Sequence, residues 1–282
     1  MRISFYAPYS RSVEASMKNP WLLGGIAALF GFGAATVRNF ESAAAREIGE
    51  KLIGDHKKVL LQVSYPGLLS PALGEVGTAT ITASTFRCEG LPLFTEPKRS
   101  KKGTIDLLRL NLTDFYLRDL RCERFLAEIP NCRFDFALAT SKKRIRLSKS
   151  GLGTGTVELL VKDLAPYILK KYGEIKSVEV TTEGDWIRVK GYGQFLVLNA
   201  DFDVKAKITT NGSQLILSDA IIRIDNKETD LDSQLALINT LNPVIDFAKD
   251  LDLYDAVDAK TVQILEDKIV VKGTVKIPNL PE

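Results

Sequence analysis

The side chains that could carry catalysis are few and scattered along this chain of 282 residues. His56 is the only histidine, and it stands between Asp55 and Lys57 at the end of a predicted helix, where we expect it to face solvent. A serine or cysteine nucleophile would depend on that single imidazole, because such nucleophiles are activated by an adjacent base. No pair of carboxylates belongs to a recognisable catalytic motif. The sequence therefore predicts a protein that is not an enzyme.

Two other patterns resemble ligand sites, and both are better explained as loops. The acidic segment 250–258 has Tyr254 at its fifth position and no glycine after it. A calcium loop of the helix-loop-helix type needs an oxygen ligand and then a glycine at those positions. The glycine-rich segment 151–155 lacks the Gly-Lys-Ser/Thr ending of a phosphate-binding loop and precedes a predicted strand. We expect a solvated acidic loop and a flexible connection, with neither metal nor cofactor.

Cysteine is scarce and odd in number, at Cys88, Cys122 and Cys132. Three thiols without paired spacing form neither a disulfide framework nor a zinc site. A Cys122–Cys132 bridge is one interpretation for a protein outside the cytoplasm. Buried free thiols are the interpretation that we favour.

The overall composition is that of a globular protein with balanced charge. Hydrophobic residues make up 45% of the chain and charged residues 26%, and 38 Lys and Arg face 35 Asp and Glu for a net charge of +3. Proteins that bind nucleic acid are usually far more basic, so we expect no nucleic-acid partner. The basic residues gather in two segments, a predicted loop at 96–102 and a predicted strand at 141–149. The strand has a charged face that either protects a sheet edge from mispairing or contacts anionic head groups.

The N-terminal region predicts export or anchoring. Residues 21–37 carry no charge and follow a polar, net basic leader. This run is longer than a typical signal-peptide core and slightly shorter than a typical spanning helix. Basic residues before it favour delivery of the rest of the chain across a membrane. We favour an uncleaved anchor, with cleavage after the small residues 33–35 and a buried core helix as the alternatives. Residues 38–282 are predicted to form a single extracytoplasmic domain that is either membrane-anchored or periplasmic.

The chain is organised around a long strand. From Leu196 to Ile208 every even position is apolar, which is the period of a strand with one buried face. Thr210-Asn211-Gly212-Ser213 follows, and Asn-Gly favours a tight hairpin turn. The chain then returns through residues 215–224.

The remaining pattern predicts strands with a few covering helices. We expect strands at 59–63, 78–86, 105–112, 133–140 and 156–161, and hairpins that turn at 183–185 and 266–267. Helices are predicted at 38–54, after an Asp163 N-cap, and after Asp232 or Ser233 with a kink at Pro243. The sequence therefore predicts an α+β fold with a long antiparallel sheet.

In this order, residues 155–278 are similar to the LmeA-like phospholipid-binding family of bacterial envelope proteins. The resemblance rests on the strand before Asp163-Leu164, the long strands, the segment 241–246 and the final strand 268–273. It implies an elongated fold like that of the tubular lipid-binding proteins. In such folds a strongly curved antiparallel sheet wraps around helices and leaves an apolar groove for acyl chains. The family offers no catalytic residues.

The leading hypothesis is a protein that binds phospholipid or another acyl lipid at a membrane surface, possible roles being lipid transfer and envelope lipid maintenance. Helices and strands apolar on one face supply more lining than a flat sheet needs, and each lipid methylene removed from water gains ~0.8 kcal/mol. Trp186 and Tyr192 lie on the opposite face of their strand and could mark a lipid–water rim. The alternative is a structural envelope protein with a closed core and no lipid. The predicted lining residues, for each of which ordinary core packing is the alternative, are Leu164, Ile168, Leu196, Leu198, Phe202, Val204, Leu235 and Ile238.

Overall fold

The computed structural model describes residues 37–90, 95–194, 199–225, 227–228, 234, 237–239 and 241–279. The chain divides into a unit Met1–Asn39 and a unit Phe40–Glu282, and the described strands all belong to the second. Among the described residues, no helix has both the length and the apolar character needed to cross a bilayer. The predicted anchor at residues 21–37 lies outside the described residues, apart from Val37.

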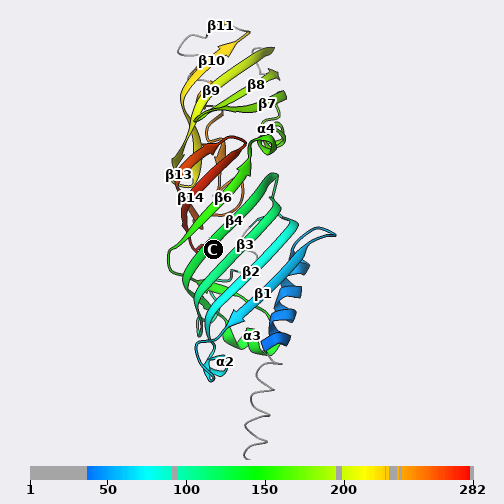
Figure 1. The fold of residues 1–282 in the computed structure, drawn as a ribbon, viewed down its shortest axis with the longest axis vertical. Helices are drawn as coiled ribbons and strands as arrows, with labels where there is room; N and C mark the ends of the chain where they lie inside the picture. The colour runs from blue at the N-terminus through cyan, green and yellow to red at the C-terminus, as the bar shows by residue number, and fades with distance from the viewer. Residues whose placement is uncertain are drawn as a thin grey trace, which may run out of the picture. The chain divides into compact units, whose positions relative to one another are not determined.

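The larger sheet has eight strands, in the order β1-β2-β3-β4-β6-β14-β13 with β5 paired to β4 (Figure 1). β2 and β13 stand five places apart in this order, which would separate them by about 24 Å in a flat sheet, yet both line the same cavity. The sheet is therefore strongly curled. The α+β class with a strongly curved sheet is therefore confirmed. Its strands are β1 Lys58–Ser64, β2 Glu75–Cys88, β3 Gly103–Leu117, β4 Leu120–Phe134, β5 Leu147–Lys149, β6 Gly153–Leu160, β13 Val257–Leu265 and β14 Lys268–Val275.

Two rows of residues that are left out of the strand pairing, each running across neighbouring strands, explain the curl. The pairing of β2 with β3 skips Thr85 and Asp114, which face each other with positive φ of 56° and 47°. The pairing of β3 with β4 skips Asp106 and Asn131, and Asn131 has a φ of 54°. Neither pairing shifts its register here, so each strand leaves one residue unpaired, and a positive φ takes the backbone out of the extended conformation and bends the strand. Since each row crosses neighbouring strands, the bends add up across the sheet.

One strand pair departs from the predicted antiparallel arrangement. β2 and β3 run parallel, with Ile81 opposite Leu110. Parallel neighbours need a connection that returns along the whole strand. Residues 89–102 join β2 to β3 in the sequence, and the basic segment 96–102 is the last part of this connection. Within it, Glu96 N–H donates a hydrogen bond to the carbonyl oxygen of Leu147 at 2.8 Å.

The second sheet has six strands in the order β11-β10-β9-β8-β7, with β12 paired to β10. Its strands are β7 Ile175–Glu183, β8 Trp186–Gln194, β9 Asn199–Asn211, β10 Gln214–Ile224, β11 Lys227–Glu228 and β12 Ile245–Asp246. The predicted alternation is confirmed in β9, where the even positions from Ala200 to Ile208 are all buried. The hairpin turn is confirmed as well, with Gly212 at a φ of 60°.

The helices are short. A helix covers residues 37–51, close to the predicted range. The others are α2 Ser70–Leu73, α3 Phe136–Lys142, the 3₁₀ turn η1 Val161–Asp163, and α4 Leu164–Lys171. Residues 234, 237–239 and 241 are helical too, and the predicted cap at 232–233 lies outside the described residues.

Three local predictions are wrong. The strand at 133–140 stops at Phe134, because the Asp135 side chain accepts a hydrogen bond from Leu138 N–H at 3.0 Å and starts α3. The basic segment 141–149 is consequently the end of α3, a coil and the short β5, not one strand. Asp163 precedes α4 without capping it, since its carboxylate binds Arg121 Nη1 at 2.9 Å instead.

The two sheets share a buried core. The turn between β9 and β10 meets β13, where Ala259 N–H donates to the carbonyl oxygen of Gly212 at 2.8 Å. One continuous cluster of buried apolar side chains contains Phe115 of the first sheet and Val204 of the second. A further cluster around Leu61 and Phe134 fills the end of the curled sheet near α3. Residues 40–282 are thus held by apolar contacts on the inner faces of both sheets.

Candidate functional site

The inner face of the curled sheet carries a partly open apolar cavity of about 190 Å³. Protein interiors contain few voids larger than a water molecule, so a space of this size is unusual. Sheet residues at its wall include Ile81, Leu110, Leu112, Phe115, Phe125, Val157 and Val271. Covering residues include Ile48 of the N-terminal helix, Leu52 directly after it, and Phe247, Leu251 and Leu253 of the segment after β12.

The pairing register gathers the wall from distant parts of the chain. Leu112 of β3 lies opposite Phe125 of β4, and Phe125 lies opposite Val157 of β6. Val157 in turn lies opposite Val271 of β14. Directly opposite residues in a sheet point to the same face. The cavity wall is therefore a continuous apolar row across four strands.

Two glycines bring backbone to the cavity surface. Gly155 and Gly273 are register partners on β6 and β14, and both line the cavity. A Cβ atom on Gly155 would stand 2.7 Å from Cγ1 of Val275, and one on Gly273 would stand 2.3 Å from the carbonyl oxygen of Asp258. The glycine-rich segment 151–155 is therefore not only a flexible connection as predicted, because from Gly153 onward it belongs to β6.

The covering segment 246–253 is fixed by buried polar contacts. Asp246 is 3% exposed, and its Oδ1 accepts hydrogen bonds from Ala248 N–H at 3.0 Å and Lys249 N–H at 3.1 Å. Asp250 Oδ2 accepts hydrogen bonds from Lys171 Nζ at 2.7 Å and from Asp246 N–H at 2.9 Å. Burial by itself would raise the pKa of the Asp250 carboxyl, but these hydrogen bonds outweigh it and hold that pKa below its ordinary value.

The same segment is tied to the curled sheet by Arg118. Its Nη1 donates to the carbonyl oxygen of Asp250 at 3.2 Å, and its Nη2 forms an ion pair with Asp252. Arg118 sits in the turn between β3 and β4, so it links the cavity wall to its cover. Farther along, Lys276 is a charged residue of the cavity lining, and its Nζ pairs with Asp255 at 2.6 Å.

The structure places the predicted lining residues elsewhere. Leu164, Ile168, Phe202 and Val204 are buried in the core cluster that the two sheets share, and Ile238 packs against that cluster half-buried. Leu196, Leu198 and Leu235 lie outside the described residues. None of the five described side chains contributes to the cavity wall.

The sequence does predict that some of the cavity-wall residues face inward. Leu108, Leu110 and Leu112 alternate in the sequence, and that alternation predicts an inward face for this strand. What alternation alone does not reveal is that Phe125 and Val157 stand beside them, because register is a property of pairing.

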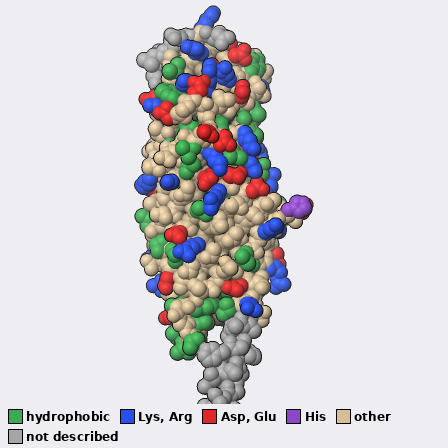
Figure 2. All heavy atoms as spheres, in the orientation of Figure 1, with side chains coloured by type: hydrophobic (Ala, Val, Ile, Leu, Met, Phe, Trp, Pro, Cys, Tyr) green, Lys and Arg blue, Asp and Glu red, His purple; other side chains and the backbone are tan. Residues whose placement is uncertain are grey.

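The groups considered above for catalysis or metal binding differ in their surroundings. In the acidic segment, Asp250, Asp252 and Asp255 each pair with a cation, and the Asp252 and Asp255 side chains stay exposed, as expected for a solvated loop. Within the described part of the chain, no group of histidine, cysteine and acidic side chains could hold a metal ion. His56 is exposed, as expected, and projects from the surface in Figure 2.

The three cysteines are free and buried. Cys122 and Cys132 lie ten residues apart on the same strand, about 33 Å, so the bridge between them is excluded. Burial raises the pKa of the Cys88 and Cys132 thiols to about 12. Burial also raises the pKa of the Cys122 thiol. These thiols are therefore protonated and unreactive near neutral pH.

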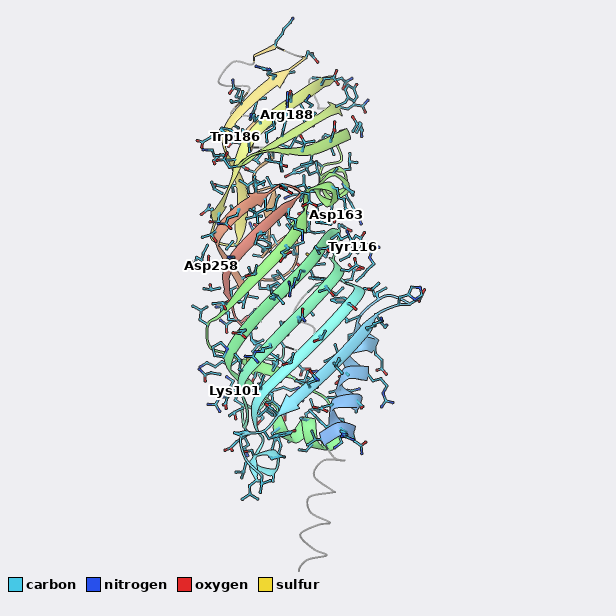
Figure 3. All side chains as sticks on the ribbon, in the orientation of Figure 1. Lys101, Tyr116, Asp163, Trp186, Arg188 and Asp258 are labelled. Atoms are coloured by element: carbon cyan, nitrogen blue, oxygen red, sulfur yellow. The ribbon has the colours of Figure 1, made fainter. Side chains whose placement is uncertain are left out.

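The aromatic pair predicted as a rim lies on β8. The Trp186 ring has Lys205 Nζ at 5.5 Å and Lys207 Nζ at 5.1 Å from its centroid. Trp186 and its neighbour Arg188 are labelled on this sheet in Figure 3, and Arg188 Nη2 pairs with Asp203 at 2.7 Å. Tyr192 is half-buried on the same strand. Trp186 therefore contacts ammonium groups on the outer face of the second sheet.

Comparison of the chain with models of protein families, with curated proteins and with solved structures gave no match. The similarity to the LmeA-like family stays a prediction from the sequence.

Proposed function

We propose that this protein binds the acyl part of a phospholipid or another acyl lipid in the cavity of the curled sheet, without catalysis. The observation that supports it is the cavity itself, about 190 Å³ with an almost wholly apolar wall. An engineered apolar cavity of about 150 Å³ in another protein stays dry and binds benzene. By that scale, this space holds roughly six to eight carbons of a hydrocarbon chain.

Energetics favour an occupied cavity. Leaving a space of 190 Å³ empty costs a fold roughly 4–5 kcal/mol, at about 24 cal/mol for each Å³. A domain typically has only about 5–15 kcal/mol of stability. Burying roughly seven methylenes returns about 5 kcal/mol, at ~0.8 kcal/mol each. A bound acyl chain would thus offset most of the cost of the cavity.

We further propose that the protein works at the outer face of a bacterial envelope membrane, held there by residues 21–37. That segment carries no charge and follows a basic leader, as positive-inside orientation requires. The described residues contain no group suited to metal chemistry, and the cysteines are buried. The protein would therefore hold, carry or present lipid rather than modify it.

A pair of adjacent substitutions on β3 tests this function. Leu110 lines the cavity and also borders a second, more open depression, whereas Asn111 lines only that depression. Leu110→Trp fills the cavity with an indole ring, and Asn111→Trp adds the same ring outside. We expect the purified full-length Leu110→Trp protein to lose at least roughly tenfold of the lipid that mass spectrometry of an organic extract detects, because about 2 kcal/mol of burial is lost. The Asn111→Trp protein should retain it.

The comparison separates cavity lipid from lipid held by the hydrophobic segment, which both variants keep. Equal lipid content in the two variants, with both folded by circular dichroism, would contradict the proposal. It would favour instead a structural protein whose apolar interior holds no ligand.

A further inference from the structure

In the connection between β1 and β2, leucine side chains are exposed to solvent and a serine side chain is buried. Leu68, Leu69 and Leu73 are 81%, 74% and 61% exposed, whereas Ser70 between them is only 6% exposed. Surface loops usually direct polar side chains outward, and neighbouring exposed leucines mark an interaction site. We call residues 68–73 the leucine tip.

The leucine tip is held in this conformation by its surroundings. Ser70 N–H donates to the carbonyl oxygen of Gly67 at 3.3 Å, and Ser70 Oγ donates to Glu75 Oε2 at 3.3 Å. Thr104 N–H donates to the carbonyl oxygen of Gly74 at 2.9 Å. Gly74 has a φ of 75° and lies so close to Phe136 that a Cβ atom would be 2.7 Å from its ring. The inward serine therefore fixes the leucines outward.

Cationic side chains flank the leucine tip. Lys101 and Lys102 are exposed and lead directly into β3, whose Thr104 binds Gly74. Lys142 is exposed at the end of α3, the helix that begins at Phe136. Figure 3 places Lys101 at the end of the sheet that carries α2, and Figure 2 shows hydrophobic side chains gathered at that end.

We propose that the leucine tip inserts into the interface of a bilayer that contains anionic phospholipid, with Lys101, Lys102 and Lys142 over the head groups. Apolar side chains flanked by lysines match such an interface, where leucines enter the acyl boundary and ammonium groups meet lipid phosphates. This inference rests on the proposed function, because a protein that takes up lipid from a bilayer has to touch that bilayer. An uncharged protein surface would offer no anionic groups for the three lysines to bind.

A fluorescent label can report the surroundings of the leucine tip. The native thiols are buried and protonated near neutral pH, so a cysteine introduced by Leu69→Cys is labelled selectively. The label is a polarity-sensitive fluorophore on the full-length chain, reconstituted into vesicles that contain phosphatidylglycerol and a lipid with a spin label on its acyl chain. Leu265→Cys is the matched control, because Leu265 is also an exposed leucine, at 53%, and ends β13 beside the turn to β14.

We expect the label at position 69 to shift its emission to the blue and to be quenched, while the label at position 265 stays in water. Replacing Lys101 and Lys102 by glutamine should reduce the preference for anionic over zwitterionic vesicles by roughly fivefold per lysine. Equal, weak quenching at both positions would overturn the proposal. A blue shift at position 69 that depends on protein concentration and needs no vesicles would overturn it too, because a second copy would then cover the tip.

The leucine tip and the cavity can fail separately. Leu110→Trp fills the cavity without contacting the leucine tip. A protein that carries both Leu110→Trp and the label at position 69 should therefore still show quenching. Leu68→Ser with Leu73→Ser should remove that quenching and leave cavity lipid in the extract. If quenching persists while no variant changes lipid content, the tip proposal stands and the cavity function fails.

Discussion

At the scale of single residues, the interior contains two kinds of apolar position. Leu112 and Val157 belong to the same packed apolar cluster as Phe202 and Val204, but only Leu112 and Val157 also border the unfilled space of the cavity. The Phe202 ring lies so close to Gly191 that a Cβ atom there would be 2.6 Å from it. Glycine at position 191 is therefore required for the Phe202 ring to approach β8 this closely.

This difference predicts the effect of Phe202→Asp. A carboxylate at a position that is 5% exposed loses the burial of a phenyl ring and has to be desolvated. We expect a loss of at least about 4 kcal/mol in the free energy of unfolding, which is enough to unfold many domains. Urea denaturation followed by circular dichroism measures it, with Asp201→Ala on the exposed face of β9 as control. A Phe202→Asp protein within about 1 kcal/mol of the original would show that this ring faces open space.

At the scale of elements, the segment 246–253 acts as a cover whose position depends on one carboxylate. Asp250 joins this segment to α4 through Lys171, and Tyr167 Oη also donates to it at 3.1 Å. The pKa of Asp250 lies below its ordinary value of 3.8 in the folded protein. A carboxyl with a lowered pKa stabilises the fold fully above its unfolded pKa, and that stabilisation disappears as the pH falls toward the folded pKa.

We therefore expect Asp250→Asn to lower the free energy of unfolding by about 1–3 kcal/mol at pH 7. The difference from the original protein should shrink once the pH falls below about 3.8, where the Asp250 carboxyl of the unfolded chain begins to be protonated while that of the folded protein is still ionised. Urea midpoints between pH 7 and pH 3 measure both effects. Asp258→Asn is the control, since Asp258 and Lys260 form an exposed pair that contributes little. A penalty for Asp250→Asn that stays constant over this range would contradict the assignment.

Elements with a strict period of two could be predicted from the sequence, and β9, the β7–β8 hairpin and the β13–β14 hairpin are confirmed. The strand predicted at 133–140 was wrong, because Phe134, Phe136 and Leu138 alternate across a boundary that Asp135 creates. Alternation describes one strand at a time and carries no information about its partner. The parallel pairing of β2 with β3 was therefore beyond such patterns.

At the scale of the whole molecule, the two sheets of residues 40–282 differ in how their inner faces are filled. The second sheet and α4 contribute mainly to a filled core, in which the predicted lining residues Leu164 and Phe202 are buried. The first sheet curls and leaves space within it. Sequence patterns predicted a curved sheet with an apolar interior, and the described lining residues that they predicted lie outside the cavity wall. The location of the cavity depends on the bends at Thr85 and Asp114, and their alignment exists only once the strands are paired.

The central claim is that an acyl chain occupies the cavity of the curled sheet. A phospholipid with a photoreactive diazirine near the end of its acyl chain, bound to the full-length protein and then irradiated, tests this claim most directly. Peptide mass spectrometry then locates the attached lipid. We expect it on β3, β4 and β6, around Leu112, Phe125 and Val157. Attachment confined to residues 21–37, with none on those strands, would contradict the account.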